Sequence, residues 1–202
     1  MIVRRADPDY QGFADLCRYQ REGVDFQVHV QSRPGSSVAI VAPHGGEIEV
    51  GTSELARAIA GDELNLYLLE GIKPADNYRA LHLTSHRFDE PRCLELLSRC
   101  DHVLVIHGCR GDTPQVLLGG LDDELKRRVV AALTAIRVDV RTAGHFYQGT
   151  EPRNICNRGR RGMGVQIELT TALRMGAAPG ALAAPIRCAL AVGSAHHPYG
   201  RP

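Results

Sequence analysis

Residues 38–54 read VAIVAPHGGEIEVGTSE, and the predicted fold is organised around this stretch. The apolar run 38–42 has the length and the β-branched residues of a buried strand. It leads into a glycine-rich turn that carries His44 and two carboxylates, Glu47 and Glu49. Open α/β sheets place their chemistry beyond the carboxyl ends of their strands. We therefore expect this turn to supply two ligands to a catalytic zinc ion.

Strands and helices alternate along the predicted chain. Short apolar or alternating runs indicate strands at residues 26–30, 38–42, 64–69, 81–84, 102–106, 116–118, 138–140 and 165–169. Amphipathic patterns indicate helices at residues 10–19, 54–60, 92–100 and 122–136, and a helix over 172–183 that is broken near Pro179. We expect Ser53 to cap the second helix and Gly61 to end it. The alternation predicts a parallel or mixed sheet with helices on both faces.

Composition limits the classes of protein to which this chain can belong. At 202 residues it is long enough for one sizeable core and too short for two comfortable domains. The formal net charge of +1 provides no overall field that would concentrate nucleic acid. Aromatic residues make up 5% of the chain and Trp is absent, which argues against stacking platforms for single strands.

Cysteine usage and the N-terminus bear on the compartment. None of the six cysteines forms a CxxC pair, so free thiols in a reducing cytoplasm are expected. The first residues include two arginines but no apolar segment behind them, and no run approaches the length of a membrane span. We therefore expect a cytoplasmic protein without a membrane partner.

Three predicted strand ends carry chemically active side chains. His44 follows one of them, together with Glu47 or Glu49, while His107 follows a second and Glu168 lies on a third. Two imidazoles and one carboxylate form a zinc site that leaves a position open for water or substrate. Glu168 is then placed to take the proton from that water. Glu47 has HxxE spacing and Glu49 can point to the same side, so the spacing leaves both open as ligands.

Four motifs occur together in one order: PHGGEIEVGTSELA, LHLTSHRFDEP, IHGC and NICNRGRRGMGVQIEL. Over about residues 24–175 the chain thereby resembles the phage-type poly-γ-glutamate hydrolases. The resemblance implies one hydrolase domain over residues 1–202, with residues 1–24 and 190–202 peripheral. It also implies a three-layer αβα fold with a mixed, mostly parallel sheet, which is zinc carboxypeptidase-like within the phosphorylase/hydrolase-like class.

The family pattern H-G-G-x-I-E is similar to the segment that begins at His44. It implies that His44 and Glu49 bind one Zn²⁺ ion, with His107 as the third ligand and Glu168 as the general base. Glu47 stands at the variable position x, which is often a small residue in the family. Glu47 is therefore kept as the alternative to Glu49.

The loop around residues 154–158 is expected to bind substrate. A γ-linked polyglutamate carries a free α-carboxylate on each residue, and a guanidinium can hold a carboxylate with two hydrogen bonds. Arg158 is the first candidate, followed by Asn157 and Asn154, whose amides could orient the substrate. Three more arginines make the loop locally basic: Arg153, Arg160 and Arg161.

Three functions are considered for a chain with these sequence features. The resemblance implies a zinc-dependent amidase or peptidase that cleaves γ-glutamyl amide bonds in poly-γ-glutamate or a related acidic peptide. A deacylase of N-acyl amino acids could use the same metal site with another substrate. The alternative of another class is a phage-associated nucleic-acid-binding or replication accessory protein without catalysis, against which the near-neutral charge argues.

Overall fold

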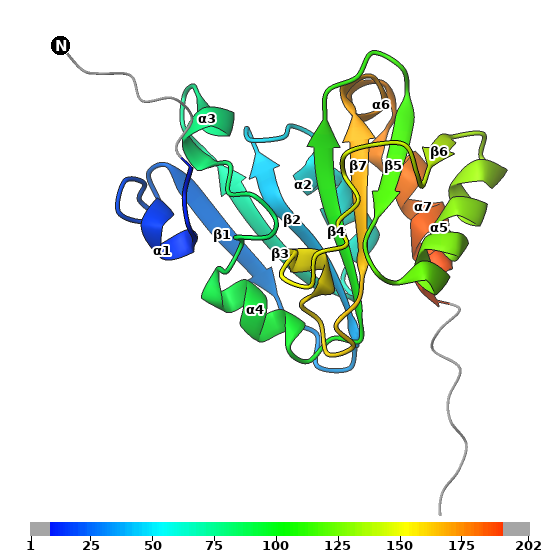
Figure 1. Cartoon of the computed structure of the whole chain (residues 1–202), viewed down its shortest axis with the longest axis horizontal. Helices are drawn as coiled ribbons and strands as arrows, with labels where there is room; N and C mark the ends of the chain where they lie inside the picture. Colours follow the sequence, from blue (N-terminus) through cyan, green and yellow to red (C-terminus); the bar gives the residue numbers. More distant parts are fainter. Residues whose placement is uncertain (1–8, 192–202) are drawn as a thin grey trace, which may run out of the picture.

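The computed structural model describes residues 9–191, and Figure 1 shows how their strands and helices are arranged. Residues 1–8 and 192–202 lie outside the described part of the chain. Nearly all of the peripheral C-terminal segment predicted at residues 190–202 therefore also lies outside it.

Within residues 9–191, seven strands form one mixed sheet in the order β1-β3-β2-β4-β7-β5-β6. The four central strands, β3, β2, β4 and β7, run parallel, whereas β1 pairs antiparallel with β3 and β5 pairs antiparallel with β7. The strands are β1 (Phe26–Gln31), β2 (Val38–Gly46), β3 (Asn65–Gly71), β4 (His102–Cys109), β5 (Gln115–Gly119), β6 (Asp139–Arg141) and β7 (Val165–Thr170). The mostly parallel, mixed sheet predicted from the sequence is confirmed.

Helices cover both faces of this sheet, so that the molecule has three layers (Figure 1). One apolar cluster packs the sheet against α2 (Thr52–Ala60), α5 (Asp123–Ala135) and α7 (Pro179–Ala191). The other cluster packs it against α1 (Phe13–Leu16), α4 (Pro91–Leu97) and the short 3-10 helix η1 (Ile155–Asn157). Two further helices, α3 (Asn77–Leu81) and α6 (Thr171–Gly176), follow the carboxyl ends of β3 and β7.

Strand β2 lies at the centre of both clusters. Ile40 and Ala42 pack into the cluster that contains α2 and α7, while Ala39 and Val41 pack into the opposite cluster. A strand that is covered on both faces needs apolar side chains at every position. This requirement explains why residues 38–42 form an uninterrupted apolar run instead of alternating with polar residues.

The chain reverses between β2 and α2 through glycines rather than through the predicted serine cap. The N-cap residue of α2 is Gly51, which has a left-handed backbone (φ 93°), and Ser53 lies inside the helix. The Ser53 hydroxyl instead accepts a hydrogen bond from the N–H of Gly46 at 3.0 Å. The prediction that Ser53 caps the helix is therefore wrong, because its hydroxyl oxygen bonds to the last residue of β2. Gly61 ends the helix as predicted.

Other boundaries also differ from the sequence prediction. Residues 81–84 are not a strand, because Leu81 ends α3 and the segment after it makes backbone contacts within the site. The first predicted helix shortens to α1, and the predicted break near Pro179 separates α6 from α7. All six cysteines are free, four of them buried. Among the described helices, none combines the length and apolar character needed to cross a membrane.

Candidate active site

The carboxyl ends of β2, β4 and β7 meet at one cavity of about 930 Å³. The register of β4 and β7 pairs His107 directly with Glu168. In β2 the pairing with β3 shifts register between Ala42 and Gly45, an irregularity that spans His44. A shift of this kind re-aims the side chains of its strand. His44, His107 and Glu168 all line the cavity, which brings together three predicted residues from distant parts of the sequence.

The imidazole of His44 is held on both sides. Its Nε2 lies 2.9 Å from the carbonyl oxygen of Leu83, and its Nδ1 lies 3.1 Å from Oε1 of Glu49. A carbonyl oxygen can only accept, so Nε2 carries the proton of that hydrogen bond. In a neutral His44 the lone pair is therefore on Nδ1 and faces Glu49.

Glu49, and not Glu47, turns into the cavity. The N–H of Glu49 donates to the carbonyl of His44 at 2.9 Å, which closes the turn, and Oε2 accepts from the N–H of Gly108 at 2.8 Å. Burial opposes ionisation of this carboxyl, but the charges and hydrogen bonds of His44 and His107 outweigh it and hold the pKa of Glu49 well below its usual range. Glu47 is exposed and lines a separate, neighbouring cavity.

His107 completes the contact between the two strands. Its Nδ1 lies 3.1 Å from Nδ1 of His44 and 3.6 Å from Oε2 of Glu49. On the other side of the ring, Nε2 lies 3.1 Å from the hydroxyl of Ser85. Both imidazoles therefore direct Nδ1 toward the same carboxylate, and both are buried.

This donor set fits a divalent cation. The lone pair of a neutral His44 is repelled by the Glu49 carboxylate and by the facing nitrogen of His107 unless a positive charge lies among them. Two imidazole nitrogens and one carboxylate oxygen are a ligand set that zinc accepts, with a fourth position left for water or substrate. The residues present are therefore chemically suited to zinc.

A fourth candidate ligand, His82, also lies at this cluster. Ligand atoms of His44, Glu49 and His82 all lie within 4.8 Å of one another, and Nε2 of His82 is 3.7 Å from Glu49. Its ring lies tilted against that of His44, with 4.2 Å between the ring centroids. Burial, followed by the charge of His44, lowers the pKa of His82 to about 3. His82 is not among the predicted ligands, because its position depends on a loop that the sequence pattern presents as a strand.

Glu168 lies beside the histidine cluster without joining it. Burial raises the pKa of its carboxyl to about 8, and the negative charge of Glu49 adds to this effect. The amide of Gln166 donates to Oε1 of Glu168 at 3.1 Å, and Asn154 donates to Gln166 at 3.0 Å. This chain of amides orients the carboxyl group of Glu168.

The residues predicted to bind substrate lie in different places. Asn154 lines the cavity. The amide of Asn157 donates to the carbonyls of Gly149 and Glu151 at 2.8 and 2.9 Å and so organises the loop. Arg158 is exposed and does not line the cavity.

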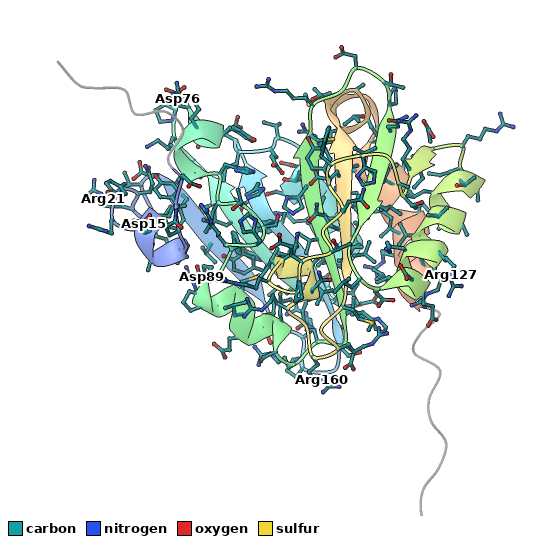
Figure 2. The ribbon with its side chains drawn as sticks, viewed as in Figure 1. Asp15, Arg21, Asp76, Asp89, Arg127 and Arg160 are labelled. Carbon is teal, nitrogen blue, oxygen red and sulfur yellow. The ribbon has the colours of Figure 1, made fainter. Side chains whose placement is uncertain are left out.

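The arginines of that loop do not line the cavity. Arg160 forms an ion pair with Asp101, and Figure 2 shows it at the lower edge of the molecule, away from the carboxyl ends of the central strands. Two other arginines, Arg110 and Arg174, line the cavity. Neither was predicted, because nothing in the local sequence around them indicates proximity to the cluster.

The sheet order, the three layers and the buried histidine–carboxylate cluster define an α/β protein with its candidate site at the strand ends. The sequence matches the family model for poly-gamma-glutamate hydrolase over residues 10–177, and the chain belongs to this family. The family resemblance inferred from the four motifs is therefore confirmed.

Solved structures of this family share the fold. A structure of a bacteriophage poly-gamma-glutamate hydrolase is 32% identical, with a TM-score of 0.84 over 92% of this chain and 97% of that one. The zinc-free apo form of YndL is 35% identical, with a TM-score of 0.76 over 82% of this chain and 81% of that one. These similarities confirm the α/β fold with a mixed sheet.

Three relatives from Bacillus subtilis (strain 168) also match. The UPF0714 protein YndL is 36% identical over 84% of this chain and 66% of its own length, and the UPF0714 protein YmaC is 34% identical over 81% and 69%. The SPbeta prophage-derived UPF0714 protein YoqZ is 39% identical over 68% and 50%. The chain thus spans between half and about two thirds of the length of these curated relatives.

Proposed function

We propose that this protein is a zinc-dependent hydrolase of γ-glutamyl amide bonds in poly-γ-glutamate or a related acidic peptide. The observation that carries the proposal is the convergence of His44, Glu49 and His107 on one point beside Glu168. The family and the zinc-free form of YndL support the substrate and the metal, respectively.

His44, Glu49 and His107 are the proposed ligands of one zinc ion. The two Nδ1 atoms and the carboxylate face one another at 3.1 to 3.6 Å, and each ring is held on its far side by the 83–85 loop. His82 is the alternative third ligand, since its Nε2 lies 3.7 Å from Glu49, but His107 is preferred because its Nδ1 lies 3.1 Å from Nδ1 of His44. Zinc in such a site supplies a positive charge that polarises the scissile carbonyl and acidifies water.

Glu168 is the proposed general base. Its carboxylate removes a proton from the attacking water and then gives that proton to the leaving nitrogen as the amide C–N bond breaks, so it is regenerated in each cycle. A buried carboxyl with a raised pKa is suited to holding a proton between these two steps. The amide chain from Asn154 through Gln166 keeps the carboxyl directed along the cavity wall.

The test separates metal binding from turnover. Glu168→Ala is expected to keep zinc, measured by elemental analysis, and to lose about 10²- to 10⁴-fold in depolymerisation of poly-γ-glutamate. Glu49→Gln and His107→Ala are expected to lose zinc, whereas the matched variants Glu47→Gln and His82→Ala are expected to keep it.

Each part of the proposal has an outcome that contradicts it. Near-normal turnover of Glu168→Ala would reject the base. Loss of metal from Glu47→Gln alone, or from His82→Ala but not His107→Ala, would reassign the ligands. Faster cleavage of small N-acyl amino acids than of the polymer would indicate a deacylase instead.

A further inference from the structure

Arg174 forms hydrogen bonds to the two segments that carry Glu168 and Glu49. It lies on α6, its side chain is half-buried, and it lines the cavity. Its Nε donates to the carbonyl of Leu169 at 3.1 Å, and its Nη1 donates to the carbonyl of Val50. These two carbonyls belong to the residues that directly follow Glu168 and Glu49.

The guanidinium also lies against the end of β4. A Cβ atom added to Gly108 would come within 2.5 Å of Nε and 2.6 Å of Cζ of Arg174, so the guanidinium occupies the space that the glycine leaves open. The N–H of the same Gly108 donates to Glu49. The positive charge of Arg174 is thus anchored beside the proposed metal ligands rather than extended into solvent, as Arg127 is on the surface of α5 (Figure 2).

Two of the three guanidinium nitrogens are used by these anchors. Within residues 9–191, Nη2 of Arg174 has no hydrogen-bond partner. A guanidinium held by backbone carbonyls is oriented before a ligand arrives, which lowers the entropy lost on binding. The cavity that it lines also contains the Glu49 carboxylate, whose negative charge would repel an anionic substrate.

We infer that Arg174 binds an α-carboxylate that flanks the scissile bond of the γ-linked glutamyl substrate. This inference rests on the proposed function and assigns its carboxylate subsite. Arg174 offsets the repulsion by the Glu49 carboxylate and places the glutamyl unit beside Glu168. Arg174 thus takes the role predicted for Arg158, which lies outside the cavity.

The experiment combines a protein change with a substrate change. KM and kcat are measured for native protein and Arg174→Gln with a γ-linked glutamyl oligomer and with the same oligomer carrying α-amides. We expect Arg174→Gln to raise KM for the acid oligomer about tenfold or more, and the native protein to lose a similar factor on the amide. With the amide oligomer, Arg174→Gln is expected to have the same KM as native protein, because that oligomer has no α-carboxylate for Arg174 to bind.

Several controls separate this role from a structural one. Arg127→Gln, an exposed arginine on α5, is expected to behave as native protein. Arg174→Lys keeps the positive charge but cannot donate to both carbonyls at once. It replaces Arg174→Gln in the KM comparison if Arg174→Gln does not fold. Zinc content and melting temperature are followed for every variant.

The inference and the proposed function fail in different ways. If Arg174→Gln and amidation of the substrate each raised KM and their factors multiplied, the inference would be overturned. It would also be overturned if Arg158→Gln, and not Arg174→Gln, lost the discrimination between the acid and the amide oligomer. Equal cleavage of the two oligomers by native protein would overturn it without any variant. Absence of cleavage of both oligomers by zinc-loaded native protein would instead reject the proposed function.

Discussion

Two imidazoles at the site are oriented by single contacts from one short loop. The carbonyl of Leu83 accepts from Nε2 of His44, and the hydroxyl of Ser85 lies 3.1 Å from Nε2 of His107. Both contacts leave Nδ1 directed toward Glu49. A hydrogen bond on the far nitrogen of a metal-binding histidine selects the tautomer and orients the ring.

Ser85 is therefore expected to affect the affinity of the proposed metal site. We expect Ser85→Ala to weaken zinc binding about 10- to 100-fold, because His107 loses the partner that orients its ring. Competition with a chelator measures the dissociation constant. Ser98→Ala is the matched control, since this exposed hydroxyl bonds only to the carbonyl of Glu95 at the end of α4. Equal zinc affinity of Ser85→Ala and native protein would contradict the proposed orienting role.

At the scale of elements, the connection between β2 and α2 needs glycine for reasons of space as well as conformation. Gly46 has a φ of +59°, and a Cβ there would lie 2.5 Å from the carbonyl oxygen of Gly71. A Cβ on Gly45 would lie 2.2 Å from the hydroxyl of Ser53. The turn can thus pack closely on β3 and α2 and return Glu49 toward His44.

Gly46→Ala is expected to destabilise the protein by about 2–4 kcal/mol, because a left-handed backbone is strained for alanine and the added methyl meets backbone atoms. Urea unfolding followed by circular dichroism gives the change in the free energy of unfolding. Gly35→Ala is the control, since it lies in a turn with nothing within 4 Å of the added methyl. If Gly46→Ala lowered the free energy of unfolding by less than Gly35→Ala does, the turn after β2 would be able to relax around the added methyl group.

At the scale of the whole molecule, the parallel centre of the sheet assembles the site. Strands β2, β4 and β7 lie side by side, although the candidate site residues that they carry are more than sixty positions apart in the sequence. Crossover connections place all three carboxyl ends at one edge. The layers of helices then bury that edge enough to shift the pKa of Glu168 upward to about 8.

This burial makes global stability depend on pH. The carboxyl of Glu168 titrates near 8 in the folded protein and near 4.5 as a model value, so the folded state binds an extra proton between these pH values. The stability contributed by Glu168 is complete below pH 4.5 and is lost as pH rises toward 8. The slope is at most about 1.4 kcal/mol per pH unit.

Metal-free protein in a chelator tests this dependence. The free energy of unfolding of native protein, relative to that of Glu168→Gln, is expected to fall between pH 5 and pH 8. Urea unfolding at several pH values measures the difference, and groups common to both proteins cancel. Glu47→Gln, which changes an exposed carboxyl, is the control. A difference that stays constant or grows with pH would contradict the assigned shift.

Much of the scaffold could be predicted from local patterns. The strands that hold His44, His107 and Glu168 are short runs of apolar residues, and such runs are recognisable because burial acts on each residue of a covered strand. The strand predicted at residues 81–84 is wrong for the complementary reason. Within it the carbonyl of Leu83 bonds to His44, and the carbonyl of the following Ser85 bonds to Ile155, so both partners lie far away in the sequence.

The sequence by itself therefore determined the family, the layered α/β fold and the strand ends that carry the proposed site residues. Tertiary structure decided that Glu49 rather than Glu47 faces the histidines, that His82 joins them, and that Arg174 lines the cavity. The physical reason is that strand burial leaves a local pattern, whereas hydrogen bonds and charge contacts between distant segments depend on how the layers pack.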